Sequence, residues 1–219
     1  MVKILAQTTA DKVFQKLRHT IVEGEIPAGS KLNEVELATR FMVSRAVIRE
    51  AISRLEALRL IERTPNVGAR VVPLSLPRLA ELYEIRETLE GMAARLAALY
   101  MDAHEIQSLK KLLSQHALQI GNGAKYYQED GDVDFHYRIL QGSKNKLLID
   151  LLMDGIYHIT RMYRVQLGMA GPRVTTAFNE HLRIVEAIES HDTELAEILM
   201  RRHIAFTRKE IENKLKETK

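Results

Sequence analysis

The sequence contains no cysteine among its 219 residues. This absence excludes disulfides, thiolate nucleophiles and zinc sites with cysteine ligands, so any bound metal must be held by histidine and carboxylate side chains. No run of about 18 apolar residues is present. The N-terminus MVKILAQTTADKV also lacks the long apolar stretch and the cleavage site of a signal peptide. We therefore expect a cytoplasmic chain with no membrane partner.

Internal repeats and low-complexity segments are absent as well, and 46% of the residues are hydrophobic. A chain of this length can bury one large core or two small ones. The net charge of +3 is unevenly distributed: residues 1–75 hold 12 Lys and Arg against 8 Asp and Glu, whereas the remainder holds 20 against 21. The basic excess therefore belongs to the N-terminal third and predicts an anionic partner there.

The first 75 residues show three helical patterns and then a change of character. Apolar residues at helical spacing predict helices over about residues 8–23, 33–41 and 44–58. The stretch LIERTPNVGARVVP then indicates two short β segments around a turn. Three helices followed by a β-hairpin is the order of a winged helix-turn-helix, which we assign to residues 1–75.

The remaining residues, 76–219, carry no strand signal and predict an all-α antiparallel bundle, so the expected fold class is mainly α. The apolar spacing predicts helices over about residues 76–100, 102–121, 124–141, 144–168, 172–190 and 192–217. Residues suited to a helix start stand near four of these boundaries: Asp102, Ser143, Pro172 and Asp192. The stretch PLSLP, residues 73–77, predicts a short, stiff connection between the two domains.

Two arginines stand one turn apart at the start of the third predicted helix, in RFMVSRAVIREAI. In isolation such a pair is typical of a solvated helix surface. In the second helix of a helix-turn-helix, however, arginine can donate two hydrogen bonds to guanine O6 and N7 in the DNA major groove. We predict that base-reading arginines, phosphate-binding residues at the helix start and wing residues contact double-stranded DNA: Arg40, Ser44, Arg45, Ala46, Arg49, Asn66 and Gly68.

Three histidines fall on the apolar faces of three different predicted helices, namely His136, His181 and His203. Asp132 lies one turn before His136, so both side chains point at the same part of the bundle interior. A single inward histidine is more often a hydrogen-bonded core residue, as we expect for His116. A shared cation, however, would satisfy all four polar groups of this set at once. We predict a divalent transition metal here, zinc first, with nickel, manganese or iron as alternatives.

The sequence resembles a known family in both halves. The segment LNEVELATRFMVSRAVIREAISRLEALRLIERTPNVGARV resembles the DNA-binding domain of GntR-family transcriptional regulators. The half that begins YEIRETLEGMAARLAA is similar to the helical FCD effector domain of the FadR subgroup. Ala46 and Val47 stand where the family often has Thr and Pro, and Arg59 stands where a Gly usually ends the helix. The resemblance therefore covers nearly the whole chain but leaves the operator sequence open.

The resemblance also implies a metal site and a small-molecule effector. The segments DVDFH, NEHLRIVEAI and RRHIAF match those that supply the ligands in metal-binding FCD domains. A small organic acid would bind at the open positions of the metal, and Arg86 matches the arginine of the family's first effector helix. An i, i+4 ion pair between Arg86 and Glu90 is the alternative for this residue. His158 and Arg161 are further candidates for the same cavity.

Together these features predict a homodimeric transcriptional regulator that binds a palindromic operator and responds to a small carboxylate effector. A metal-dependent hydrolase built on a helical bundle is the main alternative, because an open metal site can also activate water. No general base is recognisable beside the ligands, and a hydrolase has no need of the arginine-bearing helix and wing. A helical adaptor would leave the three inward histidines unexplained. The sequence does not decide between a repressor and an activator.

Overall fold

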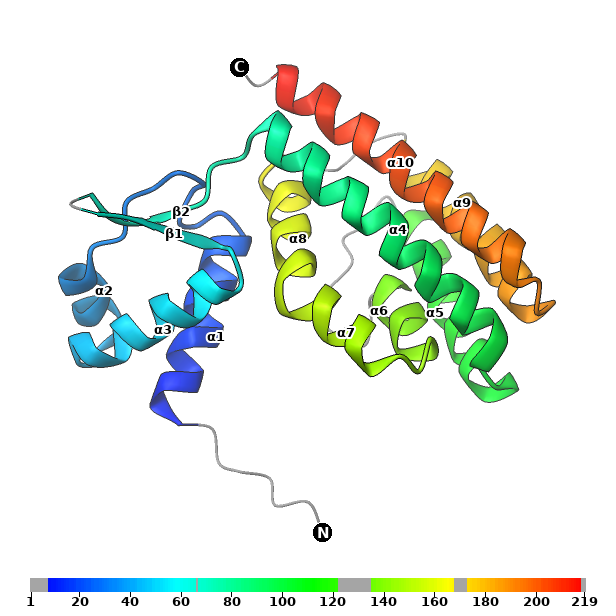
Figure 1. Ribbon diagram of the computed structural model, residues 1–219, viewed down its shortest axis with the longest axis horizontal. Coiled ribbons are helices and arrows are strands. Elements are labelled where there is room, and N and C mark those ends of the chain that lie inside the picture. The colour runs from blue at the N-terminus through cyan, green and yellow to red at the C-terminus, as the bar shows by residue number, and fades with distance from the viewer. Residues whose placement is uncertain (1–7, 66, 122–134, 168–172, 218–219) are drawn as a thin grey trace, which may run out of the picture. The chain divides into compact units, whose positions relative to one another are not determined.

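The computed structural model describes residues 8–65, 67–121, 135–167 and 173–217. The chain forms two compact units, the first of Met1–Ser75 with Met153–Gly168 and the second of Leu76–Leu152 with Met169–Lys219. Helices dominate both units (Figure 1). The sheet structure found among the described residues is one two-stranded hairpin. The predicted mainly α class is therefore confirmed.

The first unit begins with the predicted three helices and hairpin. Its elements are α1 (Thr9–Val22), α2 (Glu34–Phe41), α3 (Arg45–Ala57), β1 (Ile61–Thr64) and β2 (Gly68–Val71). The two strands pair antiparallel, with Ile61 opposite Val71 and Thr64 opposite Gly68. The apolar faces of α1 and α3 supply much of the core, because Leu17, Ile48 and Ile52 are fully buried. This is the winged helix-turn-helix that the sequence predicts.

Local signals explain where these helices begin and end. The side chains of Thr8, Asn33 and Ser44 each accept a hydrogen bond from a backbone N–H in the first turn of the helix that follows. Beyond the ends of α2 and α3, Met42 and Arg59 adopt left-handed backbone conformations with φ of 55° and 57°. Glycine is the usual residue at such positions, so both helix ends carry some backbone strain.

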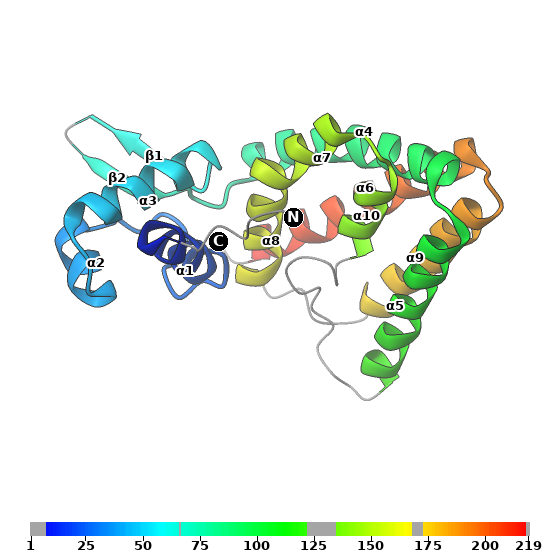
Figure 2. The same ribbon diagram turned by 90° about the horizontal axis from the view of Figure 1, so that it is seen from below.

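A segment from the second half of the sequence completes the first unit. Helix α8 (Tyr157–Gln166) packs against α1 (Figure 2). The Gln166 amide nitrogen donates to the carbonyl oxygen of Ile21 at 2.8 Å, and its amide oxygen accepts from the N–H of Ala28 at 3.1 Å. The hydroxyl of Tyr163 donates to the carbonyl oxygen of Ser75 at 3.0 Å and accepts from its N–H at 2.9 Å. The prediction assigned this segment to the helical domain, whereas these contacts tie it to the winged helix.

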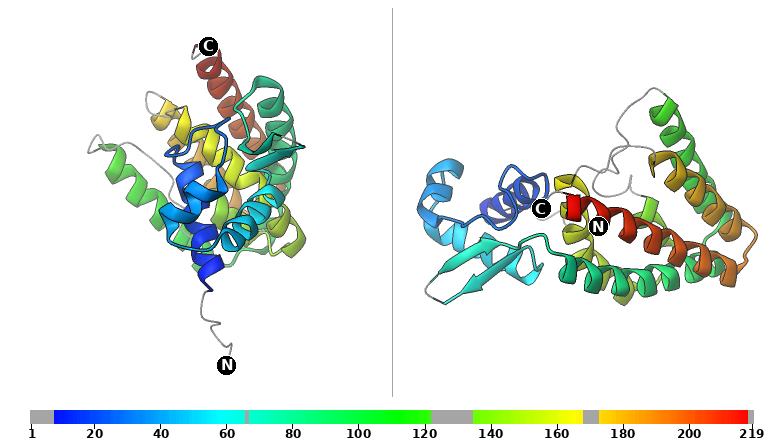
Figure 3. Two further views of the ribbon diagram at one scale, coloured as in Figure 1. Left: turned by 90° about the vertical axis from the view of Figure 1, so that its left-hand side faces the viewer. Right: turned by 90° about the horizontal axis from the view of Figure 1, so that it is seen from above.

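The second unit is built from α4 (Leu76–Tyr100), α5 (Ala103–Gly121), α6 (Phe135–Gly142), α7 (Lys146–Leu151), α9 (Arg173–Glu189) and α10 (Thr193–Glu217). Helices α4 and α10 lie side by side and run in opposite directions (Figure 3). Their approach is close at Gly91, where a Cβ atom would lie 2.6 Å from Cγ of Arg201. None of the described helices combines the length and apolar character needed to cross a membrane.

Two of the residues predicted to start helices in this unit act as N-caps, and a third does not. Asp102 and Asp192 each accept a hydrogen bond from the backbone N–H three residues ahead, as N-caps do. At the start of α7 the cap is Asn145 rather than Ser143, whose hydroxyl instead donates to a carbonyl oxygen within the preceding turn. Pro172 lies outside the described residues. The predicted helix over residues 144–168 runs from α7 into α8 through a π-helical turn, η1 (Leu152–Ile156).

Candidate metal centre and DNA-reading helix

Three histidine side chains from three helices of the second unit meet at one point. His136 lies on α6, His181 on α9 and His203 on α10, and all three are buried. The Nε2 atom of His203 lies 3.2 Å from Nε2 of His181 and 3.3 Å from Nε2 of His136. One nitrogen from each ring lies within 4.8 Å of the other two. The folded chain therefore brings together three potential nitrogen ligands that the sequence places far apart.

The outer nitrogens of two of these rings face carboxylates. Nδ1 of His136 lies 2.7 Å from Oε2 of Glu90, and Nδ1 of His203 lies 2.7 Å from Oε2 of Glu180. A neutral imidazole has one N–H, so a ring that donates through Nδ1 presents a lone pair at Nε2. The Nε2 atoms of His136 and His203 would then face each other as two acceptors, and a cation between them would remove that conflict. Such carboxylate contacts are also typical of metal-ligating histidines.

The donor set fits a divalent transition metal, because imidazole nitrogens at the centre of a buried cluster suit zinc, nickel or iron. The ring of Phe135 stacks on His181, with centroids 3.9 Å apart and planes inclined by 16°, and this contact helps to fix the orientation of the histidine. Asp132, the predicted fourth ligand, lies outside the described residues. His116 is also buried but is not part of the cluster.

Arg86 forms a buried ion pair beside this cluster, as its alternative interpretation predicted. Its Nε donates to Oε1 of Glu90 at 2.6 Å, and both side chains are almost completely buried. Glu90 therefore lies between Arg86 and His136. Burial alone would raise the pKa of Glu90, but the interactions of its carboxylate with Arg86 and His136 together outweigh burial and hold the pKa below its usual range. A direct role of Arg86 in binding an effector stays a prediction.

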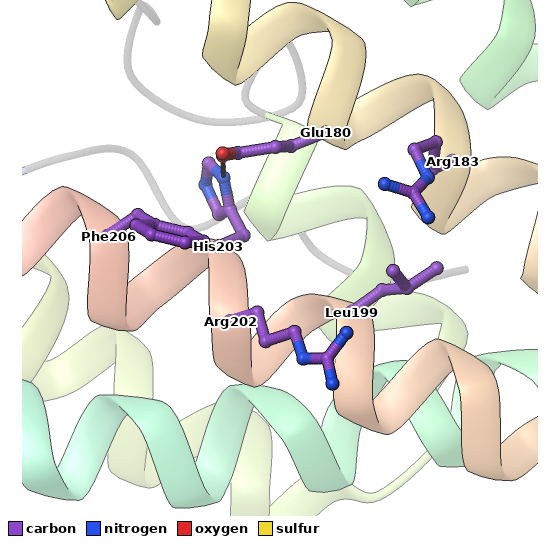
Figure 4. A pocket seen from close by; sticks show the side chains of 6 residues that line it. All are labelled: Glu180, Arg183, Leu199, Arg202, His203 and Phe206. Atoms are coloured by element: carbon purple, nitrogen blue, oxygen red, sulfur yellow. Dashed lines mark hydrogen bonds and ion pairs between the residues drawn. The ribbon is translucent and has the colours of Figure 1, made fainter.

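A cavity of about 330 Å³ lies against α9 and α10 in the same unit (Figure 4). Its wall includes the Glu180–His203 pair, the apolar side chains of Leu199 and Phe206, and two arginines, Arg183 and Arg202. Neither arginine forms an ion pair with any residue that the structure describes. The cavity therefore offers positive charge and an apolar surface close to one of the three clustered histidines.

His158 and Arg161, the further effector candidates, lie on α8 within the first unit. Nε2 of His158 lies 3.1 Å from a terminal nitrogen of Arg18. The guanidinium of Arg161 donates to Oε1 of Glu23 at 2.8 Å. Both side chains thus contact residues on or next to α1, which helps to hold α8 against the winged helix. An effector contact for either residue stays a prediction.

The arginines of the predicted reading helix are exposed and share one carboxylate partner. Arg45 and Arg49 begin α3, and the side chain of each is 57% exposed. Oε2 of Glu34, the first residue of α2, lies 2.7 Å from Nε of Arg49 and 3.7 Å from a terminal nitrogen of Arg45. The exposure leaves both arginines accessible to a large anionic partner.

The other predicted DNA-contacting residues lie on the same unit. Ser44 caps α3, and Ala46 in its first turn is exposed. Arg40 pairs with Glu25 at 3.1 Å. Gly68, the first residue of β2, is exposed and has a φ of 97°, a conformation that favours glycine. Asn66 lies outside the described residues.

Two carboxylates next to these sites were not predicted from the sequence, namely Glu34 beside the arginines and Glu180 beside His203. Glu90 was predicted as the ion-pair partner of Arg86, four residues earlier on the same helix, but its contact with His136 was not. Glu34 and Glu180 reach partners on a neighbouring helix, and spacing along the chain does not reveal such contacts.

Two family descriptions match the chain. Residues 9–71 match "Bacterial regulatory proteins, gntR family", and residues 81–206 match the FCD domain. A probable D-xylose utilization operon transcriptional repressor from Paenarthrobacter nicotinovorans is 29% identical over 93% of this chain and 88% of its own length. The uncharacterized regulator YdhC of Bacillus subtilis is 31% identical over 84% and 82%, and the repressor RspR of Escherichia coli is 26% identical over 90% and 86%.

Solved structures support the same fold. E. coli McbR/YncC superposes with a TM-score of 0.74 at 19% identity, covering 94% of this chain and 98% of that one. A putative GntR regulator from Rhodococcus sp. RHA1 gives a TM-score of 0.69 at 24% identity, with coverage of 94% and 98%. At these identities the likeness concerns the arrangement of the helices and the hairpin, not the ligands.

Proposed function

The chain belongs to the GntR family of DNA-binding transcriptional regulators and carries an FCD domain, and from this premise we propose that a small organic acid controls its binding to a palindromic operator. The acid would bind at a metal centre held by His136, His181 and His203 together with Asp132. The relatives are regulators rather than enzymes, which argues against the metal-dependent hydrolase. A regulator of this kind would work in the cytoplasm.

The meeting of three imidazole Nε2 atoms is the observation that carries this proposal. The buried Nε2 atom of His203 lies 3.2 Å from that of His181 and 3.3 Å from that of His136. In two of the three rings the outer nitrogen faces a carboxylate, as is typical of histidines that bind a transition metal. A bound metal would supply positive charge for an effector carboxylate. The donor set does not select one metal, so zinc, nickel, manganese and iron stay in competition.

The second acid group of an effector has two possible partners. Arg86 is the family-based choice, but it already donates to Glu90, so an effector would have to compete with that carboxylate. Arg183 and Arg202 in the neighbouring cavity form no ion pair within the described part of the chain. Single substitutions of Arg86 and of Arg202 therefore discriminate between the two positions.

Helix α3 carries the residues that we expect to read the operator. We propose that Arg45 and Arg49 read guanine, that Arg40 and Ser44 contact phosphates with Ala46 lining the approach, and that the turn from Asn66 to Gly68 reaches the DNA backbone or the minor groove. Palindromic operators mirror two-fold protein symmetry, so we propose a homodimer. We expect repression, because the relatives from P. nicotinovorans and E. coli are described as repressors.

The test is a screen of mono-, di- and hydroxycarboxylates by thermal shift with metal present, followed by measurement of operator binding. An effector changes operator binding only if its affinity differs between the DNA-bound and the free protein. Couplings between two binding sites are typically about 1 to 3 kcal/mol, so operator affinity should change roughly 5- to 150-fold. We expect His136→Ala to abolish the response while DNA binding without effector persists. A ligand whose effect survives both His136→Ala and Arg86→Ala would count against an effector site at the metal and Arg86.

A further inference from the structure

Glu34 is positioned to act on both reading arginines at once. It is the first residue of α2 and follows the N-cap Asn33, so the start of the helix fixes its backbone. Its carboxylate reaches across to α3, with a single oxygen 2.7 Å from Nε of Arg49 and 3.7 Å from a terminal nitrogen of Arg45. The side chain of Glu34 is 29% exposed, about half the exposure of either arginine.

The hydrogen bond to Nε restricts how Arg49 can meet a base. A guanidinium carries five N–H groups in a rigid plane, and bidentate contact with guanine uses two of them. When Nε is held by Glu34, the two terminal nitrogens remain for guanine O6 and N7. No described residue accepts a hydrogen bond from these terminal nitrogens of Arg49. The pair thus presents the end of the guanidinium that a guanine contact needs.

The charge of Glu34 also favours sequence-specific binding over binding to unrelated DNA. Phosphate attraction supplies most of the affinity for unrelated DNA and carries no sequence information. The carboxylate reduces the local charge of this group from two positive charges to one, which weakens attraction to any DNA. It leaves the directional contact with guanine in place. Both effects raise the ratio of specific to non-specific binding.

We propose that Glu34 is a positioning residue that sets the sequence selectivity of this regulator by holding Arg49 and Arg45 for base readout. The inference rests on the assignment of these arginines to guanine. An exposed ion pair contributes little to folding, so a merely structural role predicts a small change in thermal stability and none in selectivity.

The experiment uses the duplex that the full-length wild-type protein selects from a random-sequence DNA library. Affinities are measured for this duplex, for versions in which single G·C pairs are replaced, and for an unrelated duplex, each at two salt concentrations. The variants are Glu34→Ala, Glu34→Gln and Arg49→Ala. Glu36→Ala and Glu36→Gln are the matched controls, because Glu36 lies in the same turn, is exposed and contacts Asn33 rather than an arginine.

We expect Glu34→Ala to lower the ratio of specific to unrelated binding about tenfold, within the range of a lost bidentate contact. Discrimination should fall most at the G·C pairs that Arg49→Ala also affects. Glu34→Gln should retain much of it, because an amide oxygen can still accept from Nε. Binding to unrelated DNA should tighten and become more salt-dependent in Glu34→Ala. The Glu36 variants should keep the wild-type ratio, and circular dichroism and the melting temperature should match wild type throughout.

Two results would overturn the proposal and can be told apart. If Arg49→Ala loses discrimination while Glu34→Ala and Glu36→Ala behave alike, Glu34 has no more influence on selectivity than a carboxylate that contacts no arginine, and it has no positioning role. If the wild-type protein selects no duplex, or Arg49→Ala binds the selected duplex as well as wild type, the base-reading assignment itself fails.

Discussion

The two proposed sites place their charged and polar groups in opposite surroundings. Arg45 and Arg49 are more than half exposed and share the carboxylate of Glu34, which contacts Nε of Arg49. His136, His181 and His203 are buried, and their outer contacts with Glu90 and Glu180 fix the orientation of two of the rings. The exposed site suits a large partner that arrives from solvent. The buried site suits a small ion that becomes part of the folded structure.

We expect the largest effect from the loss of a histidine in the buried site. His203→Ala should remove bound metal and lower the melting temperature, because a metal that binds only the folded state stabilises it, by about 2.7 kcal/mol at 100 times its dissociation constant. Elemental analysis and thermal melts with and without EDTA measure both changes. His116→Ala is the matched control, since it also truncates a buried histidine but should leave metal content unchanged. Wild-type protein that contains no metal when purified without chelators or nickel resin would contradict the site.

The exposed site is tested by Arg45→Ala and Arg49→Ala. Each should weaken binding to the selected operator by about 1 to 3 kcal/mol, the range of one bidentate guanine contact, with helical content unchanged. Arg40→Ala should instead weaken binding to all sequences and flatten its salt dependence, as expected of a phosphate contact. Titrations at two salt concentrations separate these outcomes. Unchanged operator affinity in both Arg45→Ala and Arg49→Ala would remove α3 from the role of reading helix.

A milder substitution tests the carboxylate behind one of the proposed metal ligands. Glu180→Gln should lower metal affinity roughly 10- to 100-fold, the usual effect of losing the carboxylate behind a ligating histidine. Glu180 is preferable to Glu90 for this test, because loss of Glu90 would also leave the charge of Arg86 buried without its carboxylate. Competition with a metal chelator measures the change. Glu186→Gln, an exposed position on the same helix, should behave like wild type. Equal metal affinity in both variants would contradict a role for Glu180.

Met42→Gly should stabilise the winged helix by about 0.5 to 1 kcal/mol. Met42 is 90% exposed and has a φ of 55°, so its side chain contributes little packing while its Cβ strains the backbone. Met42→Ala keeps the Cβ and should give no gain. Urea unfolding curves compare the two variants. Equal stabilities would show that backbone strain at this turn is negligible.

The smallest effect concerns the start of α1, where the carboxylate of Asp11 accepts hydrogen bonds from the N–H and the hydroxyl of Thr8. The hydroxyl of Thr8 and the guanidinium of Arg54 lower the pKa of Asp11 from 3.8 to about 2. A carboxylate with a lowered pKa stabilises the folded state above its unfolded pKa, and this contribution disappears as the pH falls from about 4 to 2. Asp11→Asn should therefore melt below wild type at pH 6, with a difference that shrinks towards pH 2.5. A difference that does not depend on pH would contradict the assignment.

Much of the fold could be predicted because its signals are local. Thr8, Asn33 and Ser44 are recognisable caps, and the structure uses each of them. The inward direction of the three histidines also followed from apolar spacing along single helices. Where two residues compete for one role, as Ser143 and Asn145 do at the start of α7, the sequence pattern favoured the wrong one.

The contacts that could not be predicted join different elements. The apolar face of α8 was evident, but nothing in its spacing says that it packs on α1. Glu34 and Glu180 look like ordinary surface carboxylates until a neighbouring helix brings Arg49 or His203 within 2.7 Å. Sequence periodicity gives the buried face of a helix, whereas the partner of that face depends on the tertiary arrangement.

The docking of α8 on α1 has a consequence for modularity. The family boundaries suggest that the DNA-binding part could be cut away near residue 75 and studied or transplanted alone. Such a fragment would lack Tyr163 and Gln166, whose hydrogen bonds cap the chain at Ser75 and brace the loop that follows α1. A chimaera that grafts this winged helix onto a foreign effector domain would therefore have to bring residues 153–168 with it. The structural unit that such a graft must transfer is thus discontinuous in sequence.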